Sequence, residues 1–204
     1  IGNMAVSFGG VVDTIKNIAI DIKRLIDEVS RGQFYARADR TRYSGVYASI
    51  MDGINETIDT FVSDFDAIPS PVMVIDKDYT IRYMNETGAK AAKRSKEELV
   101  GMKCYDVFCT SDCKTDHCAC MQAMRDKAQR VSETDAHPAG ADLEIRYMGT
   151  PILDDGDVVG AFEVVVDLTD IKLAQRESQE QADMLTALLN DVDVAAEQVA
   201  AGTS

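Results

Sequence analysis

The sequence predicts an α+β protein in which long helices at both ends flank a small antiparallel sheet with short helices. Three observations carry this prediction: an apolar stripe with helical spacing in the first 65 residues, alternating apolar segments between residues 72 and 166, and a second helical stripe from residue 169 onward. The chain has 204 residues, of which 46% are hydrophobic. That is enough for a buried core and a length that allows one or two domains.

The first thirty residues are predicted to form a helix with a narrow apolar seam. The seam recurs at alternating spacings of three and four, and it comprises Ile1, Met4, Phe8, Val11, Ile15, Ile18, Ile22, Leu25 and Val29. A heptad seam of this kind needs a partner helix to cover it. Arg31-Gly32 ends the helix with a cation in the last turn and a glycine just past it.

A second helix is predicted after a polar connector at residues 33–43. Ser44 is its expected N-cap, and its stripe comprises Val46, Ile50, Ile54, Ile58, Phe61 and Phe65. The connector is long for a tight antiparallel hairpin and would instead suit two parallel helices. Because two helices cannot cover both stripes alone, we expect this unit to pair with the same unit of a second chain as a four-helix bundle.

The middle of the chain is predicted to be a sheet. Ile68-Pro69-Ser70-Pro71 ends the second helix, because proline lacks a backbone donor and disfavours helix at the residue before it. The periodicity then changes to two. An apolar strand at residues 72–75 is followed by a turn and a partner strand in which Tyr79, Ile81 and Tyr83 alternate with polar residues.

Short helices are predicted at residues 85–99, which are rich in alanine, lysine and glutamate. Within them Ser95 is an expected cap, with Glu98 at the third position of the helix that it starts. Two more strands are indicated further on. One alternates Leu143, Ile145 and Tyr147 with polar residues, and the other is the apolar run at residues 158–166.

A final helix is predicted to begin near Thr169. Its seam has the spacing of three and four again, and it comprises Ile171, Ala174, Leu185, Leu188, Val192, Ala195 and Val199. Ser178 and Gln181 occupy seam positions in its first half. Polar seam residues weaken a coiled coil, so we expect the second half to be the stronger one.

Composition and charge exclude several classes of protein. With 35 acidic and 21 basic side chains the formal net charge is −14, which argues against nucleic-acid binding, since that needs a cationic face. No apolar run approaches the roughly 20 residues of a membrane-spanning helix, and no signal peptide is visible. We therefore expect a soluble piece, without membrane contact, of a longer protein. No glycine-rich phosphate loop and no Ser-His-Asp set is present, so we expect no enzyme activity.

All five cysteines lie within one short segment, spaced C-x4-C-x3-C-x4-C-x-C with one histidine inside. The candidate metal ligands are Cys104, Cys109, Cys113, His117, Cys118 and Cys120. Thiolates bind zinc or iron–sulfur clusters, although the spacing matches neither a zinc-finger pair nor a ferredoxin run. Thiol–disulfide redox sensing and simple burial of small apolar side chains stay open as alternatives.

Local helix positions add two expectations about these thiols. Cys104, Val107 and Phe108 would form one apolar helix face, which favours a buried structural role for Cys104. Cys118 and Cys120 are expected at the start of a helix that ends near Lys127. Because a helix N-terminus stabilises anions, it would lower the pKa of these two thiols and favour the reactive thiolate.

Residues 66–170 resemble a PAS domain. The opening hairpin, helical insert and following short helix of that family match the run PVMVIDKDYTIRYMNETGAKAAKRSKEELVGMKCYDVF at 71–108. The Asp-x-Thr hinge between the last strand and an output helix matches VVVDLTD at 164–170. The resemblance implies a five-stranded antiparallel sheet and a signal-relay role for Asp167 and Thr169.

PAS domains hold flavin, haem or small organic ligands between the sheet and the helices, so the resemblance also implies a ligand pocket. Tyr83 and Asn85 would border it, with ordinary strand core as the alternative for Tyr83. Haem through His117 and flavin beside Cys104 rank below an unknown ligand or a zinc or iron–sulfur site, because the flavin-binding pattern around Cys104 is missing.

Residues 11–66 resemble a HAMP module, a parallel four-helix dimer that relays signals in membrane receptors. The matching positions are Gly32, Arg37, Asp39, Gly45 and Asn55. The end of the chain is similar to the segment that leads into the signalling domain of methyl-accepting chemotaxis proteins, on the stretch LLNDVDVAAEQVAAGTS at 188–204.

Together the resemblances imply a HAMP-like module at 1–66, a PAS sensor domain at 67–168 and a C-terminal signalling helix at 169–204. Such a chain would be the input and relay segment of a bacterial or archaeal chemoreceptor, the cytoplasmic portion of a parent anchored in the inner membrane. It would form a homodimer through its terminal helices and control a chemotaxis histidine kinase and its adaptor through a downstream domain. The alternatives are the sensor region of a histidine kinase and a metal- or thiol-redox-sensing PAS protein.

Overall fold

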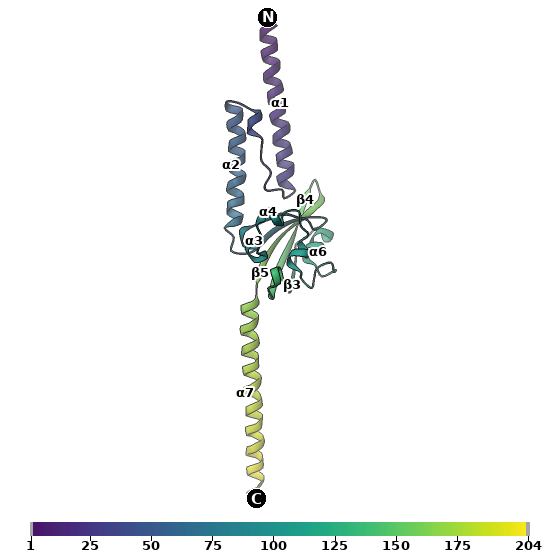
Figure 1. Ribbon diagram of the computed structural model, residues 1–204. Helices are drawn as coiled ribbons and strands as arrows, with labels where there is room; N and C mark the ends of the chain where they lie inside the picture. The colour runs from purple at the N-terminus through teal and green to yellow at the C-terminus, as the bar shows by residue number, and fades with distance from the viewer. Residues whose placement is uncertain (1, 203–204) are drawn as a thin grey trace. The chain divides into compact units, whose positions relative to one another are not determined.

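The computed structural model describes residues 2–202, and it describes side-chain environments for residues 11–192 (Figure 1). Seam positions outside this second range are Ile1, Met4, Phe8, Ala195 and Val199. The chain divides into two compact units, Ile1–Val166 and Asp167–Ser204. The expected boundary between residues 66 and 67 therefore lies inside the first unit, where helices and sheet share contacts.

The first unit begins with two long helices, α1 (Gly2–Ser30) and α2 (Val46–Asp66), joined by a connector with one short 3-10 turn, η1 (Arg40–Arg42). Three polar contacts join the connector to α2: Arg37 to Asp59 at 2.6 Å, Ala38 to Asn55 at 2.8 Å and Arg40 to Asp52 at 2.9 Å. Rising residue numbers in the connector meet falling numbers in α2, so the two run in opposite directions. The helices α1 and α2 are consequently parallel, the arrangement that the connector length suggested (Figure 1).

The seam of α1 is covered mainly by α2. Ile18 and Leu25 are buried in one cluster with Met51 of α2. Val11 and Ile15, nearer the N-terminus, are 47% and 51% exposed. The seam that predicted a partner helix is therefore covered within the chain at Ile18 and Leu25, whereas Val11 and Ile15 remain exposed.

The second helix starts one residue later than predicted. Gly45, not Ser44, is the N-cap, and it makes no side-chain capping bond. Its φ of 57° lies in the left-handed region, which glycine adopts without the steric cost that a Cβ would add. The sharp turn of the chain into α2, rather than a side-chain cap, sets where this helix begins.

The sheet has five antiparallel strands in the order β2-β1-β5-β4-β3, as expected for a PAS domain. The strands are β1 (Val72–Asp76), β2 (Ile81–Met84), β3 (Arg130–Ala136), β4 (Leu143–Asp154) and β5 (Asp157–Asp167). The apolar pattern did not predict β3. It is an edge strand of mainly polar residues, and its one large apolar side chain, Val131, is 55% exposed.

A β-bulge in β2 overturns one expectation from simple alternation. Val74 pairs with Tyr83, but the next residue, Ile75, pairs with Ile81, so Arg82 is an extra residue in the ladder. Ile81 therefore packs with Ile75 on one face of the sheet, and Tyr83 packs with Val74 on the other. The prediction that Ile81 and Tyr83 share a face, made from their spacing, is wrong for this reason.

Short helices cover one face of the sheet. They are α3 (Glu86–Ala92), α4 (Lys96–Leu99), α5 (Cys104–Phe108), α6 (Ala119–Asp126) and the 3-10 turn η2 (Pro138–Gly140). The predicted capping is confirmed at Ser95 and Glu98, which form a reciprocal capping box at the start of α4. Cys104, Val107 and Phe108 face the sheet together, also as predicted.

The opposite face of the sheet is covered by α2 and the connector. Phe34 packs there against Tyr83 and Phe65, with ring centroids 5.2 and 5.8 Å apart, and Phe65 in turn contacts Phe162 at 5.6 Å. Gly32 lets the end of α1 approach the sheet closely. Its φ is +81°, and a Cβ at this position would collide with the Val74 side chain. Both faces of β1 are thus buried.

The second unit contains a single helix, α7 (Thr169–Gly202), which begins at the predicted residue. Its exposed apolar side chains include Met184, Leu185, Leu188, Leu189 and Val192. Over the residues that the structure describes, no helix combines the length and the apolarity needed to cross a lipid bilayer.

Candidate functional site

A cavity of about 70 Å³ lies between the sheet and the short helices. The strands contribute Met73, Leu143, Ile145, Tyr147, Glu163 and Val165 to its wall. The short helices and the loop before α6 contribute Cys104, Phe108, Thr110, Cys113 and Cys118. The sheet residues point to this side because every second residue of a strand faces the same way.

The cavity is small and almost entirely apolar. Glu163 is the one acidic or basic side chain other than tyrosine and cysteine on its wall. Drug-sized ligands occupy pockets of about 300–1,000 Å³, so the present volume suits a few waters or a small molecule. It is too small for the haem or flavin that the family resemblance allowed.

Within the part of the chain that the structure describes, the Glu163 carboxyl has one hydrogen-bond partner, the thiol of Cys120, whose Sγ donates to Oε2 over 2.9 Å. Burial raises the pKa of the Glu163 carboxyl, because no cation lines the cavity to stabilise the charged form. Burial, followed by the nearby Glu163 carboxylate, also raises the pKa of the Cys120 thiol. Sequence analysis missed Glu163, although an acidic residue inside the apolar run 158–166 was a usable signal.

The thiols near α6 do not behave as the helix N-terminus suggested. Cys118 is the N-cap of α6 and Cys120 lies in its first turn, as predicted. Burial nevertheless raises the pKa of Cys118, and burial raises the pKa of Cys104 as well. The expected lowering of the pKa of Cys118 and Cys120 is wrong, because burial destabilises the thiolate by more than the helix N-terminus stabilises it.

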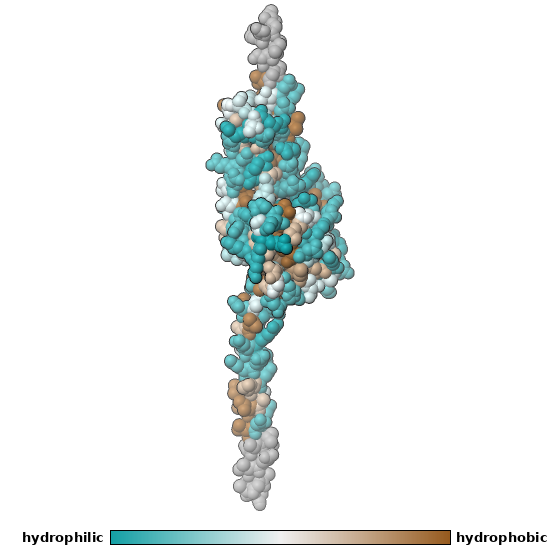
Figure 2. Space-filling model, in the orientation of Figure 1, coloured by the Kyte–Doolittle hydropathy of each residue, from teal (hydrophilic) through white to brown (hydrophobic). Residues whose placement is uncertain are grey.

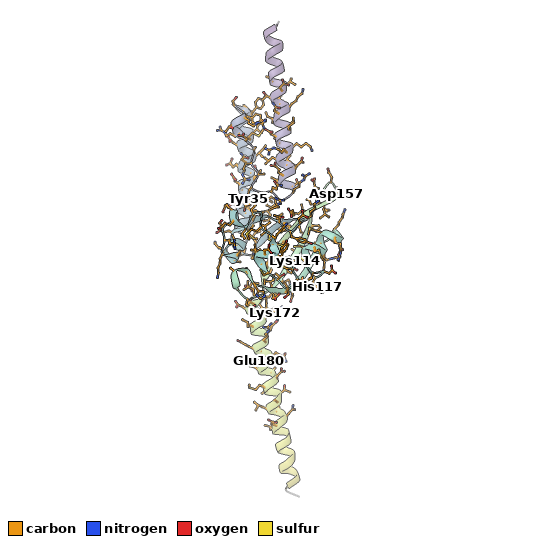
Figure 3. The ribbon with its side chains drawn as sticks, turned by 45° about the vertical axis from the view of Figure 1, so that its right-hand side comes forward. Tyr35, Lys114, His117, Asp157, Lys172 and Glu180 are labelled. Atoms are coloured by element: carbon orange, nitrogen blue, oxygen red, sulfur yellow. The ribbon has the colours of Figure 1, made fainter. Side chains whose placement is uncertain are left out.

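The six candidate metal ligands are separated by the fold. Cys104, Cys113 and Cys118 line the cavity, and Cys120 is buried beside it. Cys109 and His117 are exposed, with His117 at the outer edge of the domain (Figure 3). Among the described residues no group of three or more His, Cys, Asp or Glu side chains is arranged to hold a metal ion. In this arrangement the six residues do not fit a zinc or iron–sulfur site.

The loop between α5 and α6, which carries the cysteines, is fastened to the sheet by polar contacts. Ser111 donates to Asp135 through both its backbone N and its Oγ, each over 2.8 Å. Asp112 accepts from Ser132 at 2.7 Å and from Tyr147 at 2.8 Å. These partners lie on the edge strand β3 and on its neighbour β4, so these two strands hold the loop in place.

Asp135 joins this loop to the turn at His137. The two hydrogen bonds from Ser111 lower the pKa of the Asp135 carboxyl well below its usual range. His137 Nε2 lies 3.1 Å from Asp135, and this contact raises the pKa of the imidazole. His137 is therefore a half-exposed residue with a defined partner, Asp135.

Tyr83 and Asn85, the expected cofactor residues, do not line the cavity. Asn85 is fully buried; its Oδ1 accepts from the backbone N of Val72 and of Gly88, each over 2.9 Å. Its Nδ2 donates to the carbonyl of Phe65 in the last turn of α2 and to two carbonyls between α2 and β1, those of Ile68 and of Ser70, the last at 2.9 Å. Asn85 thus ties α3, β1 and the end of α2 together.

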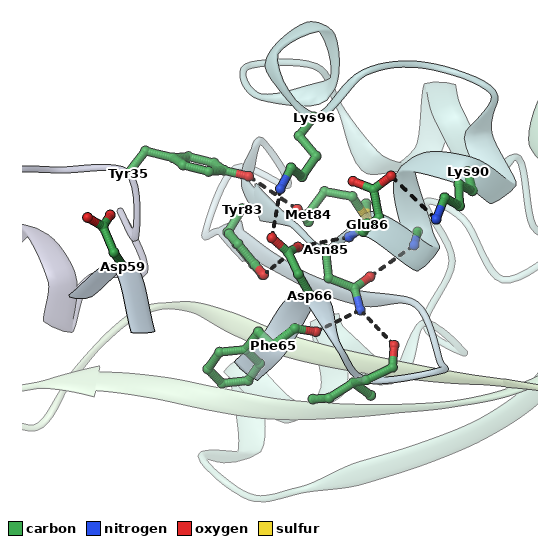
Figure 4. A network of polar contacts seen from close by, with 12 residues as sticks. Tyr35, Asp59, Phe65, Asp66, Tyr83, Met84, Asn85, Glu86, Lys90 and Lys96 are labelled. Carbon is green, nitrogen blue, oxygen red and sulfur yellow. Dashed lines mark hydrogen bonds and ion pairs between the residues drawn. The ribbon is translucent and has the colours of Figure 1, made fainter. Parts of the chain in front are cut away.

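Asp66, the last residue of α2, also belongs to this joint between the end of α2 and the sheet (Figure 4). Its carboxylate accepts from the Tyr83 hydroxyl at 3.3 Å, from the backbone N of Glu86 at 2.9 Å and from Lys96 Nζ at 2.7 Å. The end of α2 is therefore bonded to β2, α3 and α4. Tyr83 and Asn85 connect the helical segment to the sheet, a role that sequence spacing could not show.

The predicted relay residues form a compact cap at the start of α7. Asp167 Oδ1 accepts from the backbone N of Thr169 at 2.8 Å and from its Oγ1 at 2.5 Å. Asp39 caps η1 with the same two bonds to Thr41, at 3.0 and 2.6 Å. The Asp-x-Thr cap is present, and an exchange of partners during signalling stays a prediction.

Comparison with known proteins identifies the class. A family model described as the PAS fold matches residues 65–172, just over half of the chain, and the chain belongs to this family. It is a PAS sensory domain with additional helices on both sides.

Several solved structures are similar to part of this chain at low sequence identity. The PAS domain of a protein from Colwellia psychrerythraea is 21% identical over 56% of this chain and 98% of its own, with a TM-score of 0.49. An RNA-binding light-oxygen-voltage receptor is 14% identical over 61% of this chain and 37% of its own, with a TM-score of 0.51. A PAS domain from a two-component sensor histidine kinase is 14% identical over 55% and 96%, with a TM-score of 0.47.

Proposed function

We propose that this chain is the sensory input and signal-relay segment of a bacterial or archaeal chemoreceptor. In this role the chain carries out no catalysis itself. A change in the cavity biases the packing of the flanking helices, and those helices pass the bias to a kinase-control domain further along the receptor. The observation that carries the proposal is that two strands of the sheet face the cavity on one side and the N-terminal helices on the other.

The alternation along β5 makes this coupling direct. Glu163 and Val165 line the cavity, whereas Phe162 and Val164 belong to the aromatic and apolar cluster around Phe34. The same holds for β1, where Met73 lines the cavity and its neighbours face the other way. A shift of these strands at the cavity therefore also displaces the side chains that pack against α2 and the connector, because one layer of backbone carries both sets.

The joint at the end of α2 gives the coupling a rigid link. Asp66 and Asn85 bond α2 to the sheet through buried or half-buried contacts, and Gly32 brings the end of α1 against Val74. Movement of the sheet would then move both helices together. On the output side, the cap formed by Asp167 and Thr169 is the candidate relay into α7.

Apolar side chains left uncovered on the helices support a homodimer. On α1 and α2 they include Val11, Ile15, Val46, Ile50 and Phe61. On α7 they gather around the middle of the helix, at residues 184–192, where Figure 2 shows a brown patch. Pairing of the helices with those of a second copy would bury both sets, as in a helix bundle.

The output partners follow from the resemblance to chemotaxis receptors. They are a chemotaxis histidine kinase and its adaptor, reached through a downstream signalling domain, in a receptor anchored in the inner membrane. The sensor region of a histidine kinase is the runner-up. A phosphoacceptor-histidine helix after residue 204 would favour the kinase, and long heptads with Glu/Gln pairs would favour the receptor.

The coupling can be tested in a chimera that joins this chain to the signalling domain of a characterised chemoreceptor. Replacing Phe34 by Ala removes the ring that contacts Tyr83 and Phe65, so we expect a change in basal kinase activity. Val131→Ala, on the exposed edge strand, is the control and should leave the kinase activity unchanged. Kinase activity that is identical in wild type and Phe34→Ala, with both folded, would contradict coupling through this face.

Asp167→Ala in the same chimera tests the output joint. Loss of the cap should alter kinase control without unfolding the PAS domain, because the Asp167 carboxylate accepts its hydrogen bonds from Thr169 at the start of α7. The dimer is tested separately by sedimentation of the chain over a range of concentrations. A well-folded single subunit at every concentration, with both terminal helices intact by circular dichroism, would refute the dimer.

A further inference from the structure

Two of the cavity cysteines are brought to the same wall by the loop between α5 and α6. Cys113 and Cys118 both line the cavity. Between them the chain makes successive turns, with the backbone N of Thr115 bonded to Asp112 O at 3.1 Å and that of Cys118 bonded to Thr115 O at 3.3 Å. The loop thus folds back on itself, and it directs both thiols into one apolar space.

The two thiols interact electrostatically. Burial is the main reason that the pKa of Cys118 is raised, and a negative charge on Cys113 raises it further. The loop that carries them is held on both sides of Cys113. Asp112 is bonded to Ser132 and Tyr147, and the backbone N of Ala119, next to Cys118, is bonded to the Tyr147 hydroxyl at 3.0 Å.

The sulfur of Cys113 is held in place by Thr110. It accepts a hydrogen bond from the backbone N of Thr110 over 3.3 Å and lies 3.1 Å from the Thr110 hydroxyl. These contacts fix the Cys113 sulfur in the wall of the cavity, where it can act as the attacking thiol in thiol–disulfide exchange. Cys118, whose thiol is desolvated by burial, is suited to follow as the second thiol.

We propose that Cys113 and Cys118 form a redox-active dithiol in the wall of the cavity, oxidised reversibly to a disulfide by a small-molecule disulfide such as oxidised glutathione. The Cys113 thiolate attacks one sulfur of the small disulfide, whose S–S bond breaks, and a glutathione thiolate leaves and takes up a proton. Cys118 then loses its proton to water and attacks Cys113 Sγ in the mixed disulfide, which releases the second glutathione. The two cysteines are oxidised as one small disulfide is reduced to two thiols.

The consequence for signalling rests on the proposed function. Both sulfurs are part of the cavity wall, so joining them reshapes the space that Glu163 and Val165 face from β5. The redox state of the dithiol would then set the same strand positions that a bound molecule sets. The sensor would respond to the thiol–disulfide balance of its compartment as well as to any ligand.

The test uses the full chain, purified under reductant and then incubated with oxidised glutathione. Free thiols are alkylated with iodoacetamide and the peptides are mapped by mass spectrometry. We expect two of the five thiols to become protected, a linked peptide pair containing Cys113 and Cys118, and recovery of all five after dithiothreitol. Cys113→Ser keeps an acceptor for the Thr110 bonds and should abolish the internal disulfide, whereas Cys109→Ser, at the exposed position, should keep it.

Several outcomes would overturn the proposal. One is that all five thiols remain alkylated, and another is that the disulfide links Cys104 or Cys109 instead. A third is that added Zn²⁺ protects Cys113 and Cys118 while oxidised glutathione does not, which would assign the pair to metal binding. The thiol mapping involves no kinase, so failure to form the disulfide would not contradict the proposed signal relay. A Phe34→Ala chimera with unchanged kinase activity would likewise not contradict the proposed dithiol.

Discussion

Replacing Gly32 by Ala tests the contact between the end of α1 and the sheet. The residue has a φ of +81°, and a Cβ built on it would collide with Val74 Cγ1 and lie 3.4 Å from Val74 Cβ and 3.7 Å from Ile152 Cδ1. Val74 is fully buried between its neighbours in β1, so it has little room to move aside. The added methyl therefore strains the backbone and crowds the core at once.

The expected destabilisation is the sum of two terms. A left-handed φ costs an alanine about 1–2 kcal/mol. Forcing an extra methyl into a packed core costs about 1–3 kcal/mol. Gly32→Ala should therefore lower the free energy of unfolding by about 2–5 kcal/mol if the end of α1 stays docked on the sheet.

The assay is urea unfolding followed by circular dichroism, with Gly53→Ala as the matched control. Gly53 lies inside α2, and a Cβ at that position meets no atom within 4 Å. The same substitution should therefore stabilise the protein by up to about 1 kcal/mol, because alanine is the better helix former. Opposite signs at the two glycines are the signature of the packed contact. An unfolding midpoint for Gly32→Ala equal to that of wild type would refute close packing of α1 on Val74.

Three further predictions concern the joint, the cavity and the loop. Asn85→Ala leaves the buried backbone N of Val72 without the Asn85 acceptor and removes several other hydrogen bonds, so the free energy of unfolding should fall by about 3–5 kcal/mol. The control Asn17→Ala, at an exposed position of α1, should change the free energy of unfolding by less than about 0.5 kcal/mol. Because burial raises the pKa of Glu163, the contribution of its carboxyl to stability is favourable at low pH and is lost as pH rises through the folded pKa. Glu163→Gln should thus gain thermal stability over wild type as pH rises from about 4 to 7. A difference in thermal stability between the two proteins that does not change with pH would contradict this. Hydrogen bonds from Ser111 lower the pKa of Asp135, so the contribution of its carboxylate to stability is present above about pH 4 and is lost as the pH falls. In Asp135→Asn the stability should therefore fall less steeply toward acid pH than in wild type. Parallel plots of stability against pH for the two proteins would contradict this.

Features set by a few neighbouring residues could be read from the sequence. The capping box of Ser95 and Glu98, the start of α7 at Thr169 and the face shared by Cys104 and Phe108 all depend on contacts within one or two turns of chain. The five-stranded sheet was expected only from the family resemblance, because β3 is a polar edge strand whose own residues carry little apolar alternation.

Features that depend on distant residues were decided by the tertiary structure. The bulge at Arg82 places Ile81 and Tyr83 on opposite faces because β1 fixes the register, and the spacing within β2 does not contain that information. The thiol of Cys118 has a raised pKa because the sheet buries it, which local helix position could not show.

The sequence by itself determined the long helices, the apolar strands and the clustering of the cysteines along the chain, but not the polar edge strand β3. Only the packed structure separated exposed Cys109 from cavity-lining Cys113 and Cys118, and placed Glu163 among them. The physical reason is that secondary structure follows from local hydrogen bonding and side-chain periodicity, whereas burial, charge state and shared cavities depend on which remote segments the sheet brings together.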